Sequence, residues 1–188
     1  MGNNHSGRNS HFGDIEMNNH SSLGRPILLM DFGSARDLVV RLTDRSTVLQ
    51  LCEDAARYST ISYRAPELFD GGCRHGPLEP DIDGKIDVWS CGCLLYAMMY
   101  GASPFETEFR NDGSIKVVEC THLRVLGGNL PHVPAKRASW YGYGSEILEL
   151  VEWMLTVDRA ERPMIDDVCD RVENFLRKGT ARGRTDFV

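Results

Sequence analysis

The sequence lacks a long hydrophobic run, an excess of basic residues and paired metal-ligand motifs. No apolar stretch approaches the ~20 residues that cross a bilayer. With 21 Lys and Arg against 27 Asp and Glu, the formal charge is −6, whereas general nucleic-acid binders usually show a basic surface. We therefore expect no nucleic-acid partner and no stable membrane anchor. The 188 residues, 41% hydrophobic and 26% charged, indicate one soluble globular domain with a substantial core.

The six cysteines form no recognisable disulfide or zinc pattern. Cys91 and Cys93 lie two residues apart in an apolar helical run, so their side chains point to different faces and cannot share a tetrahedral metal. Cys73 and His75 are a close pair without a second pair at zinc-finger spacing. No secretory signal is recognisable. We expect six reduced thiols in a cytoplasmic protein.

Composition divides the chain into three parts. Residues 1–24 are rich in Asn, Ser, Gly and His and almost free of large apolar side chains, which is typical of a disordered segment. Residues 25–178 carry the apolar periodicity of a folded domain. Residues 179–188 form a basic tail, which we interpret as a solvated terminus and not as a phosphate-binding site.

The folded part is predicted to begin with a short β element. Residues 27–30 are four consecutive apolar residues between Pro26 and Asp31, and this pattern predicts a short buried strand. The tripeptide Asp31-Phe32-Gly33 follows as a turn, and we expect residues 34–36 to be extended. Taken alone, the tripeptide is better explained as an ordinary strand-to-turn junction.

The remainder is predicted to be mostly helical. Helical spacing of apolar residues predicts helices over 47–57, 145–155 and 162–178, and a continuous apolar stretch predicts one over 83–101. The helix at 83–101 is apolar nearly all round, so we expect it to be buried on every face, with Gly101 as its stop. Ser145 is the expected cap of the third helix, and Pro163 lies near the first turn of the fourth. The predicted fold class is therefore mainly α.

Four short motifs follow one another along the chain. Each motif alone has a structural explanation as a turn, a core helix or a helix start. Their joint occurrence in one order makes chance a poor explanation. The motifs are Asp31-Phe32-Gly33, then Ala65-Pro66-Glu67, then Asp87 with Gly101-x-x-Pro104-Phe105, and last Arg162-Pro163.

This order of motifs resembles the C-terminal lobe of eukaryotic-type protein kinases over residues 25–178. The stretches TISYRAPELF (60–69) and LLYAMMYGASPF (94–105) are most similar to the Numb-associated kinase family, in the branch named for its myristoylated and palmitoylated serine/threonine kinase. The resemblance implies a helical kinase lobe without an N-terminal lobe. It also implies that the full-length form transfers a phosphoryl group from ATP·Mg²⁺ to Ser or Thr of a protein.

Within that resemblance, the residues near the tripeptide match functional positions. Asp31 matches the carboxylate that ligates Mg²⁺. Phe32 would pack beneath the upper lobe as part of a regulatory spine, and Gly33 completes the turn. Thr60 matches the threonine that contacts the catalytic aspartate. The helix at 47–57 matches a helix that family members hold inside the activation segment.

Further matches are structural. Glu67 and Arg162 match a buried ion pair that ties the activation segment to the helical core. Asp87 matches an aspartate that accepts backbone N–H bonds from the catalytic loop, and a buried carboxylate does need such partners. Leu94 and Met98 match helix positions that support the adenine-side spine.

The catalytic parts of a kinase are not recognisable in the chain. Nothing before Asp31 matches the Gly-rich loop, the strand lysine or the helix glutamate. Asp14 and Asn19 have the spacing of the catalytic-loop Asp and Asn, but Glu16 stands where a lysine is expected, and His11 is one residue too far from Asp14. We therefore reject this pair and assign no catalytic residue in the chain.

The first residues fit an acylation pattern through Gly2 and Ser6. One myristoyl chain gives only marginal membrane affinity, and neither a nearby cysteine nor a polybasic segment supplies a second signal. We interpret the match as coincidence and expect a cytoplasmic location, with association to Golgi-like membranes only if Gly2 is acylated.

Two functions remain open from the sequence. The chain is either the C-terminal part of a serine/threonine kinase, inactive alone, or a non-catalytic kinase-like module that binds a protein. The retained Asp31, Gly33, Thr60 and Glu67 favour the first, and the absence of nucleotide-binding motifs favours the second. We expect ATP and Mg²⁺ as cofactors of the full-length kinase and none for this chain. We also expect a protein substrate for the full-length form and association through exposed lobe surface.

Overall fold

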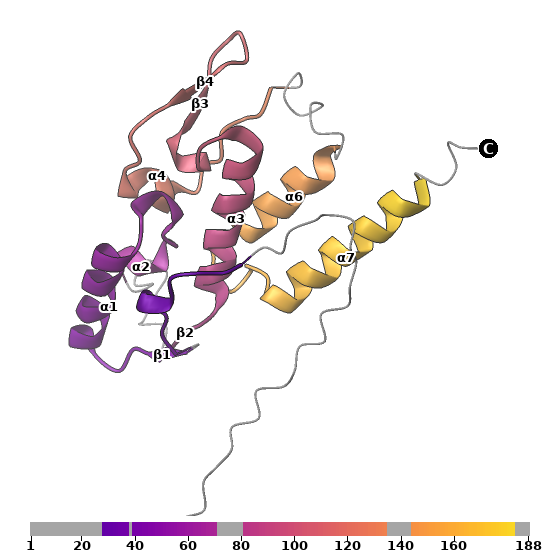
Figure 1. Cartoon of the computed structure of the whole chain (residues 1–188). Helices are drawn as coiled ribbons and strands as arrows, with labels where there is room; N and C mark the ends of the chain where they lie inside the picture. The colour runs from indigo at the N-terminus through magenta and orange to yellow at the C-terminus, as the bar shows by residue number, and fades with distance from the viewer. Residues whose placement is uncertain (1–27, 38, 71–80, 135–143, 183–188) are drawn as a thin grey trace, which may run out of the picture. The chain divides into compact units, whose positions relative to one another are not determined.

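The computed structural model of the chain describes residues 28–37, 39–70, 81–134 and 144–182. Two units are distinguished, Met1–Ala35 and Arg36–Val188, and each is considered by itself. Most of the described part of the second unit is helical, with two small antiparallel sheets (Figure 1). Its helices are α1 (Arg45–Tyr58), α2 (Glu67–Asp70), α3 (Lys85–Tyr100), α4 (His122–Gly127), α6 (Gly144–Met154) and α7 (Ile165–Arg182). The predicted mainly α fold is confirmed.

The described part of the first unit corrects the predicted strand. Residues 28–30 form no strand, and the side chains of Leu28, Leu29 and Met30 are exposed; Ile27 lies outside the described residues. A strand needs a neighbouring strand for its N–H and C=O groups and a layer to cover its side chains, and residues 28–35 supply neither. Ser34 ends a single 3₁₀ turn, Phe32–Ser34, so the extended backbone begins only at Ala35.

Helix α1 confirms the helix predicted at 47–57 and extends it at both ends. Asp44 caps its first turn, because the Asp44 side chain accepts a hydrogen bond of 2.9 Å from the Thr47 backbone N–H. Val48 and Leu51 on its inner face are buried, as the helical spacing of the apolar residues predicted.

Helices α3 and α6 pack side by side and organise the core (Figure 1). Trp89 of α3 stacks on Phe105, with ring centroids 5.5 Å apart. Gly101 ends α3 in the left-handed conformation, as expected. The core also takes residues from the segments on either side of α3, including Leu42, Ala65, Ile82, Val125, Val151 and Leu155.

The prediction that α3 is buried on every face is wrong. One face is buried through Val88, Trp89, Gly92, Cys93, Tyr96 and Tyr100. The opposite stripe, at spacings of four, three and four residues, is exposed and consists of Asp87, Cys91, Leu94 and Met98. Composition could not reveal this, because both faces are equally apolar and only the neighbouring elements decide which is covered.

Helices α6 and α7 agree with the predictions in their existence but not in their details. Ser145 lies inside α6, which begins at Gly144, so Ser145 is not its cap. Helix α7 begins at Ile165, after Arg162 and Pro163. Its expected inner stripe is only partly covered: Val168 is buried, whereas Ile165, Cys169 and Leu176 are exposed. The terminal helix therefore meets the core through its first two turns, by Val168 and Val172.

Four short strands were not predicted. Strands β1 (Val40–Arg41) and β2 (Asp81–Ile82) pair antiparallel, as do β3 (Thr107–Phe109) and β4 (Ile115–Val117). Strands of two or three residues are too short for an alternating pattern to show in the sequence. None of the helices that the structure describes is long and apolar enough to cross a membrane.

Candidate functional site

The turn at Asp31 holds the first residue of the predicted site. Asp31 has φ 65° and ψ 68°, the left-handed region that a non-glycine residue seldom adopts. The following 3₁₀ turn is closed by the Ala35 backbone N–H, which donates to the Phe32 carbonyl over 3.0 Å. The Asp31 and Phe32 side chains are exposed, so the carboxylate is open to a ligand.

The segment after α1 turns sharply around Thr60. The Arg64 guanidinium donates from Nε to Ser59 Oγ (2.9 Å) and from its second nitrogen to the Ser59 carbonyl (2.8 Å). It also lies 5.0 Å from the centre of the Phe69 ring. Arg64 is almost buried, and this burial lowers its pKa. The clamp closes a loop whose first residue, Thr60, keeps an exposed side chain.

Glu67 and Arg162 are brought together, 95 residues apart in sequence. Two parallel bonds of 2.8 and 3.0 Å join the Arg162 guanidinium to the two Glu67 carboxylate oxygens. Both side chains are buried. A buried pair of this kind is retained only with good geometry and partners for its remaining protons.

The other Arg162 protons do have partners. Its Nε donates to the Thr156 carbonyl over 2.9 Å, and one terminal nitrogen also donates to the Lys85 carbonyl over 3.0 Å. The guanidinium lies 4.9 Å from the centre of the Trp89 ring. Arg162 therefore joins α2, the start of α3 and the loop before α7.

The remaining predicted site residues lie on the exposed stripe of α3. Leu94 is 53% exposed and Met98 is 74% exposed. Asp87 is exposed as well, so the expectation of a buried carboxylate there is wrong for this chain. Among the described residues, no hydrogen bond reaches that carboxylate.

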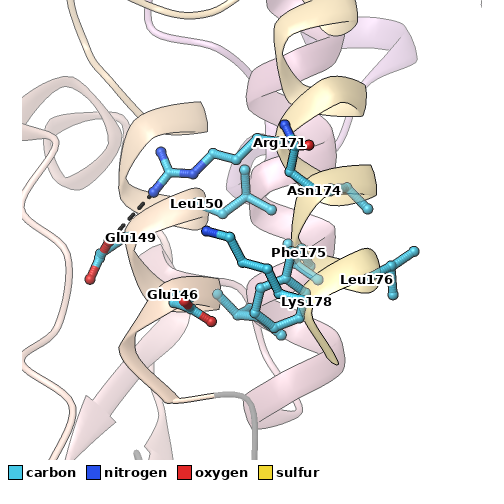
Figure 2. A pocket seen from close by; sticks show the side chains of 11 residues that line it. Glu146, Glu149, Leu150, Arg171, Asn174, Phe175, Leu176 and Lys178 are labelled. Atoms are coloured by element: carbon cyan, nitrogen blue, oxygen red, sulfur yellow. Dashed lines mark hydrogen bonds and ion pairs between the residues drawn. The ribbon is translucent and has the colours of Figure 1, made fainter. Parts of the chain in front are cut away.

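Sequence reasoning missed a groove between α6 and α7 (Figure 2). Its volume is about 650 Å³. Leu95, Leu150, Val172 and Phe175 are the apolar part of its lining, together with Ile147 and Leu176. Charged residues line it from both helices, and Figure 2 shows Arg171 reaching from α7 toward Glu149 of α6 at 3.5 Å. The signal available in the sequence was the number of apolar residues on α6. Some of them face the core and others, such as Ile147, line the groove.

Comparison with known proteins identifies the family. Residues 15–172 match the family described as the protein kinase domain. The chain belongs to the protein kinase family. It is 34% identical over 152 residues to mouse serine/threonine-protein kinase 16, and 34% identical over 151 residues to a probable serine/threonine-protein kinase of Dictyostelium discoideum. The Schizosaccharomyces pombe kinase ppk13 is 30% identical over 164 residues.

These alignments cover most of this chain but a minor part of each relative. They take in 80% of the chain and 43% of the mouse kinase, and 80% of the chain and 37% of the Dictyostelium kinase. With the fission-yeast kinase the shares are 86% and 43%. The chain thus spans about two fifths of the length of the relatives it matches.

Kinases of this type use ATP and Mg²⁺, and the described residues do not by themselves fit that pair of ligands. No group of three or more His, Cys, Asp or Glu side chains converges in the part of the chain that the structure describes. Asp31 is an exposed single carboxylate, whereas protein-bound Mg²⁺ usually shares one or two carboxylates with substrate phosphates. The rejected residues Asp14 and Asn19 lie outside the described residues.

Proposed function

We propose that this chain is the C-terminal part of a serine/threonine protein kinase domain and that it does not transfer phosphoryl groups alone. The observation that carries the proposal is the buried pair of Glu67 and Arg162. It joins the segment after the Asp31 turn to the helical core, as the resemblance implied. The serine/threonine kinases among the relatives, each more than twice as long as the matched part, support the same reading.

Within this proposal, Asp31 is the residue that would hold Mg²⁺ in the complete kinase. Thr60 would face the catalytic base, and Phe32, Leu94 and Met98 would support the nucleotide-binding half. The side chains of Phe32, Thr60, Leu94 and Met98 are exposed. Exposure is expected of residues that another part of the complete protein would contact. The Numb-associated branch remains our assignment from the stretches at 60–69 and 94–105.

The exposed stripe of α3 fits the same proposal. Asp87 would accept backbone N–H bonds from the catalytic loop, which the remainder of the kinase would supply. We expect the reading frame upstream of Met1 to encode a His-x-Asp-x-x-x-x-Asn loop, a strand lysine and a Gly-rich turn. In-frame stop codons there, with a transcript that starts at Met1, would favour the non-catalytic interaction module instead.

Nucleotide binding tests the proposal directly. We expect no shift in the melting temperature of the isolated chain with millimolar ATP·Mg²⁺, because a single exposed carboxylate does not retain the metal. A ligand present at 100 times its Kd would stabilise the fold by about 2.7 kcal/mol, which is readily measured. A clear shift in the wild type that Asp31→Asn abolishes would contradict the proposal and restore Asp14 and Asn19 as candidates.

A further inference from the structure

The structure describes two buried arginines, and their surroundings differ. Arg162 faces the carboxylate of Glu67. Arg64 is only 9% exposed, but none of the ion pairs among the described residues includes it. Its guanidinium donates to two neutral oxygens of Ser59, the hydroxyl over 2.9 Å and the backbone carbonyl over 2.8 Å. Buried charges are normally paired, so Arg64 lacks the counter-charge that Arg162 has.

The titratable groups around Arg64 do not supply that counter-charge. The groups that act on its charge are the thiols of Cys52 and Cys120. Burial raises the pKa of Cys120 to about 11, and thiols in general carry little negative charge near pH 7. Burial lowers the pKa of Arg64, because no carboxylate of the described residues offsets the loss of solvent around the guanidinium.

The hydroxyl of Ser59 lies where an anion would balance this charge. Ser59 is exposed, so an enzyme can reach it, whereas the guanidinium beside it is buried. A group attached to Ser59 Oγ would stay close to Arg64 Nε, which lies 2.9 Å from that oxygen. A phosphate adds nearly two negative charges and accepts strong, charge-assisted bonds from arginine. We propose that Ser59 is a phosphorylation site and that Arg64 is the residue that binds its phosphate.

In this reaction the chain is the substrate of another kinase molecule that holds ATP. Ser59 Oγ attacks the γ-phosphorus of ATP and forms the new P–O bond. The bond from that phosphorus to the oxygen bridging to the β-phosphate breaks, and ADP leaves with the electron pair. The hydroxyl proton passes to the catalytic base of the acting kinase. The proposal is therefore independent of the proposed function of this chain.

Two local effects oppose each other once Ser59 is phosphorylated. Ser59 is the C-cap of α1, and its hydroxyl donates to the Ala55 carbonyl over 2.6 Å. The phosphorylated side chain has no proton for that bond, and the dipole of α1 disfavours a negative charge at its C-terminal end. Attraction to Arg64 is the larger effect, because the guanidinium is buried and little screened, whereas the helix end is exposed to solvent. The phosphate thus ties the end of α1 to the turn that begins at Thr60.

Phosphoserine placed at position 59 during synthesis of the intact chain tests this attraction. We expect the melting temperature of the phosphorylated chain to exceed that of the unmodified chain by about 2–4 °C. In R64Q only the effects at the helix end remain, so phosphorylation should lower the melting temperature. R57Q is the matched control. Arg57 also belongs to the last turn of α1, but it is exposed and lies over the Tyr58 ring, so its loss should leave the gain unchanged.

Phosphorus NMR measures the pairing itself and keeps the test valid if R64Q does not fold. The second pKa of a phosphoserine is about 6. Arg64 favours the dianion, so we expect the pKa of the phosphate on Ser59 to fall to about 5 in the folded chain. In urea, where the pair is separated, this pKa should return to about 6. The folded R57Q chain should keep the lower value.

Mass spectrometry of the protein from its own cells tests whether the modification occurs. Trypsin cleaves after Arg57 and Arg64, so residues 58–64 form one peptide that also contains the hydroxyl groups of Tyr58 and Thr60. Fragmentation of this peptide should place the phosphate on Ser59.

Four results would overturn the proposal. The first is a peptide that carries no phosphate or carries it only on another residue. The second is an equal effect of phosphorylation on the melting temperatures of wild type and R64Q, and the third is a phosphate pKa that is the same in the folded and unfolded chain. The fourth is a saturable rise in the melting temperature of the unmodified chain with inorganic phosphate that R64Q abolishes, because Arg64 would then bind a free anion.

Discussion

At the residue scale, Arg162 concentrates the charge interactions of the core. Replacement by Ala would leave the Glu67 carboxylate buried without a counter-charge, and would free the Thr156 and Lys85 carbonyls. Loss of one partner from a buried pair typically costs about 3–5 kcal/mol. We expect Arg162→Ala to lower the free energy of unfolding by about that amount, measured by urea denaturation.

The exposed Arg177 supplies the control for this prediction. It pairs with Glu173 one helical turn away, and both side chains are largely exposed. Such pairs contribute about 0.3–0.5 kcal/mol. Equal denaturation midpoints for Arg162→Ala and Arg177→Ala would contradict a buried role for Arg162.

Gly128 is a second position at which a single added atom is expected to lower stability. It ends α4 with φ 62°, and a Cβ added there would lie 2.0 Å from Cγ2 of Val157. Gly113 has φ 81° but no atom within 4 Å of such a Cβ. Both changes to Ala carry the left-handed backbone penalty of about 1–2 kcal/mol, and only Gly128→Ala adds the collision. We expect a lower melting temperature for Gly128→Ala than for Gly113→Ala, and the reverse order would disprove the close packing of α4 against Val157.

At the element scale, the exposed stripe of α3 is the surface through which we expect the chain to associate. Leu94 and Met98 expose apolar surface, 53% and 74% of each residue, and covering it would contribute part of the roughly 1.5–3 kcal/mol that full burial of such a side chain provides. We expect the wild-type chain to self-associate as its concentration rises, and L94E/M98E to remain monomeric in sedimentation velocity. Leu123→Glu on α4 is the control, since Leu123 is also exposed but belongs to a different helix. If Leu123→Glu abolished association and L94E/M98E did not, the associating surface would lie on α4 and not on α3.

The elements show what a sequence pattern can and cannot predict. Helix α1 was predictable because its apolar residues lie on one face and Asp44 supplies a cap. The exposed stripe of α3 was not predictable. The sequence of an apolar helix face is the same whether or not another element of the protein packs against that face. The strand predicted at 27–30 is absent at the described residues 28–30 for a related reason. A run of four apolar residues favours a strand, but a strand forms only where a second strand pairs with it.

At the scale of the whole molecule, motif order predicted more of the site than local pattern did. Glu67 and Arg162 could be paired in advance only because the intervening motifs resembled one family; no periodicity links residues so far apart. The clamp of Arg64 on Ser59 and the groove beside α7 have no such signature. They arise from the tertiary placement of helices, which the sequence encodes only through the complete fold.

The separation of Glu67 and Arg162 also has a consequence in time. A ribosome adds about 5–20 residues per second, so the 95 residues between the two take roughly 5–20 s to synthesise. Throughout that interval Glu67 has left the peptidyl-transferase centre while its partner does not yet exist. Until Arg162 has been made, the Glu67 carboxylate lacks its counter-charge and α2 lacks its tie to the loop before α7. Nascent chains stalled before Arg162 should therefore be cut by protease near α2, whereas released chains should resist.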